Sequence, residues 1–110
     1  MNFIENDEQF DAMQEALLRE IVRAIRTGLG DIGIEPEKAF EATEKMTFSI
    51  AALLDGARPV MIEGEKVKPF LAFKKDKNCL LSNGGSSLHE MAFDVALEVC
   101  GDVDEAAGLE

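Results

Sequence analysis

The chain has 110 residues, a hydrophobic content of 46% and a net charge of −11, values that indicate one globular domain. This charge disfavours general binding to nucleic acid or anionic lipid, and no apolar run reaches the roughly 18–20 residues that a membrane span needs. The N-terminus lacks the segments of a signal peptide, and two cysteines are too few for a disulfide scaffold, so we expect a cytoplasmic protein with reduced thiols.

The first predicted element is a helix over residues 7–27, which Asn6 or Asp7 caps and the glycines at 28 and 30 end. Its apolar side chains recur at steps of three and four and predict one buried stripe: Phe10, Met13, Leu17, Leu18, Ile21, Val22 and Ile25. A glycine-rich connection follows the helix over residues 28–35. It leads into a second helix, so we expect the two to form a helical hairpin.

The second predicted helix begins near Pro36, a residue favoured in the first turn, and runs to about Leu54. Its expected apolar set is Ala39, Phe40, Thr43, Met46, Thr47, Ile50, Ala51 and Leu54. The sequence Asp55-Gly56 stops this helix.

Residues 58–82 change character, because short apolar runs alternate with turn sequences. This pattern predicts a small antiparallel meander of two or three strands. Pro69 cannot donate a hydrogen bond to a neighbouring strand, so we expect a bulge or unpaired stretch that divides residues 66–68 from 70–74.

A third helix is predicted to begin at a capping box formed by Ser87 and Glu90 and to end near Cys100. The predicted order is therefore ααβββα, an α+β fold with helices on one face of the strands. Residues 1–101 are expected to form the single domain and residues 102–110 an acidic, flexible tail. The last two residues, 109–110, are either native or a remnant of a cloning tail.

Three acidic residues, Glu90, Asp94 and Glu98, share one face of the third predicted helix at four-residue spacing. Such like charges repel by a few tenths of a kcal/mol per pair, and no Lys or Arg in residues 86–101 offsets them. We interpret this acidic triplet as a docking face for a basic partner. The alternative is a solvated face, or one beside the chain's own basic strands.

Basic residues are concentrated in residues 66–77, a stretch with a net charge of +4. They are Lys66, Lys68, Lys74, Lys75 and Lys77. With Phe70 and Phe73 they give a weak signal for stacking single-stranded bases. A core strand flanked by protective lysines is the preferred interpretation, and an acidic protein partner is a third. We expect no nucleic acid partner.

The loop of Asn83, Gly84, Gly85 and Ser86 joins a predicted strand to the N-terminus of the third helix. Free amides in such a position can bind an anion, which makes the loop a weak candidate for a phosphate or small-ligand site. An ordinary turn is the alternative, because no Lys or Arg lies nearby in the sequence.

Catalytic and metal-binding sets are not indicated. His89 is the only histidine, and Cys100 lies three helical turns away, roughly 16 Å along the axis, too far for a Cys–His pair. The spacing of Cys79, His89 and Cys100 fits no zinc motif. We therefore expect no cofactor, no metal and no enzymatic activity.

Taken together, these patterns predict a small acidic protein that acts as a non-enzymatic binding or regulatory module, such as an inhibitor, an antagonist or an immunity-like protein. It would dock a basic partner surface through the acidic triplet. One alternative is a self-associating structural domain, a homodimer whose helix stripes complete a core across a two-fold axis. A less favoured alternative is a small-ligand or phosphate-binding protein. No motif in the sequence is specific enough to indicate a family.

Overall fold

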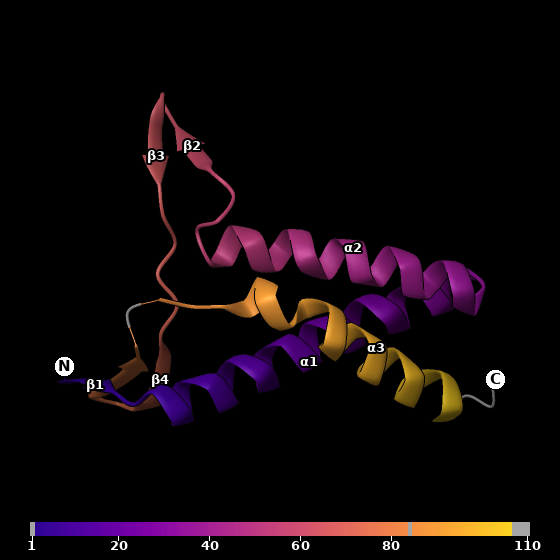
Figure 1. The fold of residues 1–110 in the computed structure, drawn as a ribbon, viewed down its shortest axis with the longest axis horizontal. Coiled ribbons are helices and arrows are strands. Elements are labelled where there is room, and N and C mark those ends of the chain that lie inside the picture. Colours follow the sequence, from indigo (N-terminus) through magenta and orange to yellow (C-terminus); the bar gives the residue numbers. More distant parts are fainter. Residues whose placement is uncertain (1, 84, 107–110) are drawn as a thin grey trace.

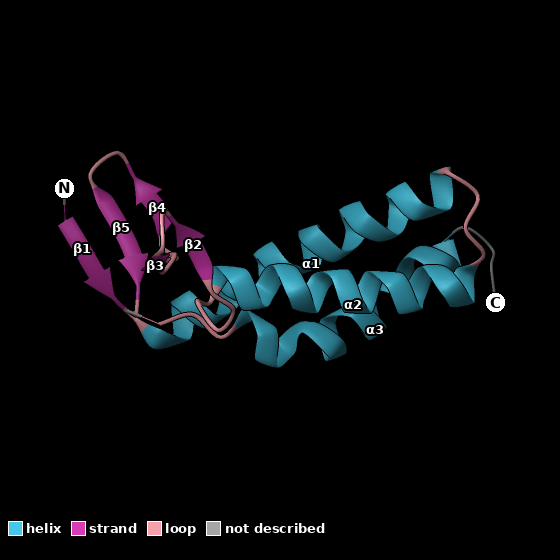
Figure 2. Cartoon of the chain, turned by 90° about the horizontal axis from the view of Figure 1, so that it is seen from above, coloured by secondary structure: helices cyan, strands magenta, loops and turns pink. Residues whose placement is uncertain are grey.

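The computed structural model describes residues 2–83 and 85–106, which form an α+β fold. Two helices, a group of strands and a third helix follow one another as predicted, but a further strand precedes the first helix. Three helices, α1 (Asp7–Asp31), α2 (Pro36–Leu54) and α3 (Leu88–Ala106), pack together along the long axis of the molecule (Figure 1). The strands lie at the end of this helical layer where α1 and α3 begin (Figure 2). The predicted fold class is confirmed.

The strands form two separate sheets instead of one meander. In the first, β5 (Cys79–Ser82) lies between β4 (Phe73–Asp76), which is antiparallel to it, and β1 (Asn2–Glu5), which is parallel to it. The second sheet is an antiparallel hairpin of β2 (Val60–Ile62) and β3 (Glu65–Val67). Residues 68–72, around Pro69, are unpaired and separate the sheets, as expected.

The turn of the β2–β3 hairpin is built from two residues with left-handed backbone conformation, Glu63 at φ 49° and Gly64 at φ 82°. Two such residues match the twist of paired strands, and glycine adopts this conformation without steric cost. The local sequence therefore explains why the chain reverses here.

The buried stripe of α1 includes three of the predicted residues, Phe10, Leu18 and Val22, and adds Gln14 and Arg26, which were not predicted. The other predicted row, at Met13, Leu17, Ile21 and Ile25, is half-buried. Two polar side chains thus enter the core, and both have partners. Gln14 accepts a hydrogen bond from the Ser87 amide at 2.7 Å and donates to Asp11, while Arg26 pairs with Asp104.

The face that α2 buries consists of small residues: Ala39, Thr43, Thr47, Ala51 and Ala52. Small side chains allow the neighbouring helices to approach closely. The core cluster then forms between Leu18 and Val22 of α1 and the apolar face of α3 around Leu88 and Val95. Met46 and Ile50, which were expected in the core, are 45% and 37% exposed.

Two helices extend further than predicted. The first does not stop at Thr27 but continues to Asp31, where Gly33 adopts φ 89° and its amide donates to the Gly30 carbonyl. The third continues past Cys100 to Ala106.

Ion pairs to α1 hold this last part of α3 in place. Arg19 lies 3.9 Å from Asp102, and the buried Arg26 pairs with Asp104. The first five residues of the predicted acidic tail are therefore helical, which corrects the predicted helix end. The last four, including 109–110, lie outside the described residues. None of the helices in the described part of the chain combines the length and the apolar character needed to cross a membrane.

Candidate functional site

The acidic triplet lies on the exposed side of α3, with all three carboxylates accessible to solvent. Glu98 pairs with Arg19 of α1 at 3.1 Å, so the basic residue that relieves its charge comes from another helix. Glu90 and Asp94 form no ion pair within residues 2–83 and 85–106. These two carboxylates remain the uncompensated part of the triplet.

An apolar stripe runs beside the triplet and was not predicted from the sequence. Phe93 and Leu97 follow His89 at four-residue spacing on α3 and are 53% and 54% exposed. Phe93 meets Phe40 of α2 edge to face, with ring centroids 6.4 Å apart. Further along α2, Phe48 is 49% exposed and lies edge-on to His89, with centroids 6.1 Å apart.

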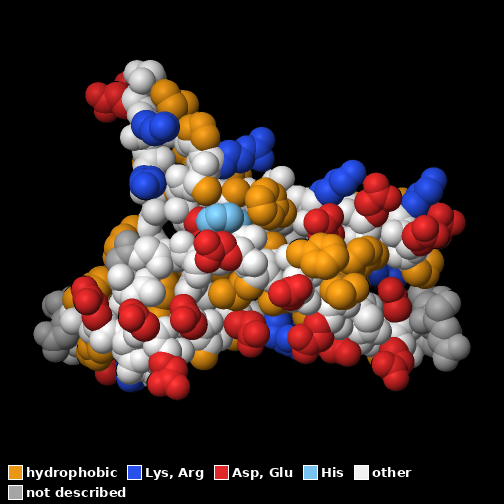
Figure 3. Space-filling view, in the orientation of Figure 1, with side chains coloured by type: hydrophobic (Ala, Val, Ile, Leu, Met, Phe, Trp, Pro, Cys, Tyr) orange, Lys and Arg blue, Asp and Glu red, His pale blue; other side chains and the backbone are white. Residues whose placement is uncertain are grey.

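We call this combined surface the acidic–apolar face: Phe48, Phe93, Leu97, Glu90, Asp94 and Glu98. Hydrophobic and acidic side chains gather over α2 and α3 on the side that Figure 3 shows. The sequence held one signal for it. Residues 93 and 97 are apolar but fall outside the buried stripe of α3, directly beside the acidic positions.

A buried carboxylate organises the end of this face nearest the strands. Asp55 follows α2, its side chain is 1% exposed, and it accepts hydrogen bonds from Ser86 Oγ at 2.5 Å and the His89 amide at 2.7 Å. His89 Nδ1 lies 2.5 Å from the same carboxylate. Burial raises the pKa of Asp55, but the hydrogen bonds from Ser86, His89 and Leu88 outweigh it and hold the pKa below 3.8.

Asp55 also replaces the predicted capping box of α3. The side-chain cap comes from Asp55, whereas Ser87 contributes its backbone carbonyl, which accepts from the Glu90 amide at 3.1 Å. A carboxylate at a helix N-terminus is favoured by the helix dipole, and here it also links α2 to α3. The cap was missed because its donor and acceptor lie 34 residues apart.

The same contacts bear on the predicted ligand loop of Asn83, Gly84, Gly85 and Ser86. The Gly85 amide donates to Asn83 Oδ1 at 3.0 Å, Ser86 Oγ donates to Asp55, and the next amide, of Ser87, donates to Gln14. Gly84 lies outside the described residues. An incoming phosphate would meet the Asp55 carboxylate where free amides were expected, so this geometry does not favour an anion site.

Ser86, His89 and Asp55 are the residue types of an acyl-transfer triad, but the hydrogen bonds among them are arranged differently from those of a triad. In a triad the histidine lies between the hydroxyl and the carboxylate and takes the hydroxyl proton. Here Asp55 lies between the other two and accepts from both. The Ser86 hydroxyl is therefore bonded to a carboxylate of lowered pKa and not to the histidine that a triad requires.

The two thiols lie apart from this cluster. Cys79 is half-buried on β5, and Cys100 is buried in the core, where burial, chiefly, raises the pKa of its thiol. A raised pKa keeps the thiol protonated and unreactive. Among the described residues, no three His, Cys, Asp or Glu side chains gather so that they could hold a metal ion.

The five lysines of the predicted basic patch do not form one surface. Lys66 lies on β3 and Lys68 just beyond it, whereas the other three lie on β4 and the turn that follows it. The two sheets are separate, and Lys75 Nζ bonds Gln9 Oε1 of α1 at 3.1 Å. The expected patch therefore divides into two groups, one on the β2–β3 hairpin and the residue after it and one on β4 and its turn.

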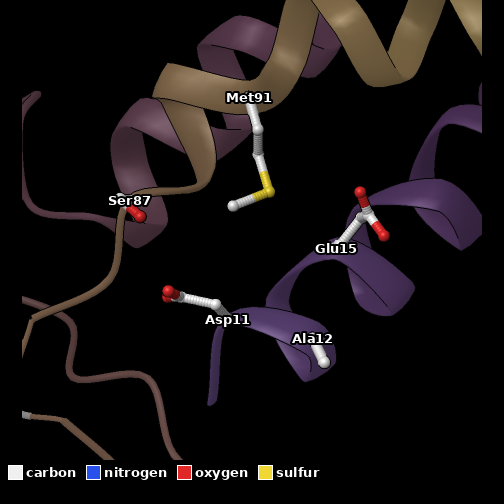
Figure 4. Close-up of a pocket in the computed structure, with 5 residues that line it drawn as sticks. All are labelled: Asp11, Ala12, Glu15, Ser87 and Met91. Atoms are coloured by element: carbon white, nitrogen blue, oxygen red, sulfur yellow. The ribbon is translucent and has the colours of Figure 1, made fainter. Parts of the chain in front are cut away.

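Between α1 and the start of α3 lies a shallow hollow of about 360 Å³ (Figure 4). Asp11, Ala12 and Glu15 line it from α1, and Ser87 and Met91 line it from the other side. Asp11 is already bonded to Gln14, and the remaining groups offer one carboxylate, a hydroxyl and a thioether. This combination indicates no particular ligand.

Comparisons with family models, with curated proteins and with solved structures found no match.

Proposed function

We propose that this protein is a non-enzymatic binding or regulatory module that docks a basic, partly apolar protein surface on its acidic–apolar face. The observation that carries the proposal is the pairing, on one surface, of half-exposed Phe93 and Leu97 with the unpaired carboxylates of Glu90 and Asp94. Each kind of group supplies a different part of recognition.

The apolar side chains supply affinity. Burial of apolar area contributes about 25 cal/mol per Å², so covering the exposed half of a Phe or Leu gains roughly 1 kcal/mol. Exposed apolar groups bordered by polar ones are typical of interaction sites. Phe48, Phe93 and Leu97 together offer such an area on two adjacent helices.

The carboxylates supply selection and speed. Charges at the rim of an interface attract a partner of opposite sign and raise its association rate more than its affinity. Glu90 and Asp94 repel one another across one helical turn, at a cost of a few tenths of a kcal/mol. A cationic partner would remove this repulsion as well as gaining the attraction.

The chemistry of the remaining polar cluster supports a binding role. Hydrogen bonds among Asp55, Ser86 and His89 link α2 to α3 and so fix the relative position of the two helices that carry the face.

The two free cysteines fit a reducing compartment, and a cytoplasmic location belongs to the same proposal.

The test places a photo-crosslinking aromatic, p-benzoylphenylalanine, at position 93, where it replaces one exposed aromatic with another. We expect irradiation in native lysate to give one predominant covalent adduct. The adduct should fall several-fold in the E90K/D94K variant and at high salt, because charge attraction guides the encounter.

The matched control is E15K/D31K, which makes the same change in net charge at two exposed acids of α1. It should leave the adduct intact. No adduct, or one that both double variants reduce equally, would contradict the proposed face. A variant that loses its far-ultraviolet circular dichroism would be replaced by E90Q/D94Q, which removes the charge with less change in side-chain size.

A further inference from the structure

The β2–β3 hairpin projects from the molecule without cover. We call residues 58–68 the arm, which rises from the end of α2 and points away from the helical layer (Figures 1 and 3). Its strands pair with one another, and no other helix or strand of the described chain packs against them beyond marginal contact. Met61, Ile62 and Val67 are 56%, 58% and 42% exposed.

An isolated two-stranded hairpin is marginally stable in water, and this one exposes apolar side chains on both faces. Directly paired residues point to the same side of a sheet. Val60 pairs with Val67 and Ile62 with Glu65 on one face, while Met61 pairs with Lys66 on the other. Both faces thus carry apolar and charged side chains, and no other helix or strand of the described residues covers either of them.

The charge of the arm is opposite to that of the rest of the molecule. It holds three basic and two acidic side chains, a net of +1, whereas the rest of the chain holds eight basic and twenty acidic side chains, a net of −12. Arg58, Lys66 and Lys68 form no ion pair in the part of the chain that the structure describes. The arm is therefore both apolar and locally basic.

These are the properties that the acidic–apolar face requires of its partner. Within one molecule the two surfaces do not meet, because the arm points away from the helices that carry the face (Figure 1). A second molecule can bring its arm to this face.

We propose that the acidic–apolar face binds the arm of a second copy of this chain, in a two-fold dimer in which each copy supplies one arm and one face. The inference rests on the proposed function and names the partner of that face. Two-fold symmetry makes each contact occur twice, which doubles the area that a small arm can bury. The face of the arm that carries Met61 and Lys66 fits this surface: Met61 covers Phe93 and Leu97, and Lys66 approaches Glu90 and Asp94.

The experiment is a charge-swap mixture of purified full-length chains, with mass measured by native mass spectrometry and analytical ultracentrifugation across micromolar concentrations. The arm variant is K66E/K68E and the face variant is E90K/D94K. Each alone has like charges in both contacts, so each is expected to dimerise at least roughly tenfold more weakly than the unaltered chain. Mixed in equal amounts, they have opposite charges in both contacts and should form a heterodimer.

The control for general charge attraction is K74E/K77E, which makes the same change on β4 and its turn, away from the arm. By itself it should dimerise like the unaltered chain, because its arm and its face are unchanged. Mixed with E90K/D94K, it should give far fewer heterodimers than K66E/K68E does, because one of the two contacts then has like charges. Circular dichroism of every variant checks that the helices are retained; these lysines and acids are exposed, so we expect folding to persist.

The outcomes separate this inference from the proposed function. An unaltered chain that stays monomeric, or a mixture that does not recover dimers, overturns the arm-to-face contact. If position 93 still crosslinks another protein in a charge-dependent way, the binding module stands with a different partner. If position 93 crosslinks neither another protein nor a second copy, the proposed function itself fails.

Discussion

The helical layer and the arm differ in which side chains they bury and which they expose to solvent. In the helical layer, polar side chains such as Gln14, Arg26 and Asp55 are buried and bonded, and the apolar core around Leu18 is closed. In the arm, apolar side chains such as Ile62 are exposed, and no other helix or strand among the described residues packs against them beyond marginal contact. The core of the layer is closed within one chain, whereas the apolar side chains of the arm are left exposed.

This difference has a consequence for stability and function. Residues that fold the molecule are concentrated where packing is closed, because a buried side chain contributes its transfer free energy only when its neighbours are fixed. Side chains available for recognition are concentrated where packing is open. A substitution at a buried position such as Leu18 should therefore affect unfolding, whereas one at an exposed position of the arm or of the acidic–apolar face should affect association.

The largest expected effect comes from Leu18→Ala, with Ile62→Ala as its matched control. Leu18 is fully buried in the core cluster, so its truncation should lower the free energy of unfolding by about 2–5 kcal/mol. The control removes a similar volume from the exposed arm and should cost less than about 0.5 kcal/mol in the monomer. Urea titration of both variants, followed by circular dichroism, checks the difference. Equal losses would show that the arm folds as part of the core.

The next effect concerns the link between α2 and α3. Asp55→Ala leaves Ser86, His89 and the start of α3 without their acceptor, and we expect a loss of about 2–3 kcal/mol. Urea titration gives the value. The control is Asp31→Ala, at an exposed acid of α1, which should stay within about 0.5 kcal/mol of the parent chain.

The same carboxylate predicts a pH dependence. Because the folded pKa of Asp55 lies below 3.8, its contribution is present above that pH and is lost as the pH falls through the folded pKa. The gap in unfolding free energy between the parent chain and Asp55→Asn should therefore narrow between about pH 5 and pH 2. Urea titrations at a series of pH values test this. A gap that widens in acid would mean that the pKa is raised instead.

The smallest expected effect is Gly64→Ala in the turn of the arm. A side chain at φ 82° costs about 1 kcal/mol, although no atom lies within 4 Å of the added carbon. Since the arm packs on little else, the loss should be confined to it. Amide hydrogen exchange should become faster for residues 60–67 and stay unchanged in α1, and the midpoint of urea unfolding should not change. A lower midpoint would show that the arm unfolds together with the helices.

Part of this fold follows from short-range patterns in the sequence. Asn6 caps α1 by accepting from the Gln9 amide at 3.0 Å, and Pro36 opens α2, as predicted. Pro69 lies in the unpaired stretch between the sheets. Each of these depends on a residue acting within a few positions of itself. β1 escaped prediction because four residues become a strand only by pairing with β5, far along the chain.

The candidate site shows the same division. Helical periodicity alone placed Glu90, Asp94 and Glu98 on one face, and the structure leaves the first two without a cation among the described residues. Helical periodicity could not place Phe48 beside His89, because the packing of α2 on α3 decides that contact. Nor could it show that five lysines close in sequence belong to two separate sheets.

The sequence by itself determined the three helices, the α+β class and the acidic spacing on α3, because these depend on hydrophobic period and local capping. Only the tertiary structure decided which polar groups enter the core, where α3 ends and which side chains adjoin the triplet. Arg26 and Asp104 are 78 residues apart, and Asp55 and His89 are 34 apart. No local preference specifies such pairs; they form where packing brings buried charges together and desolvation makes an unpaired one costly.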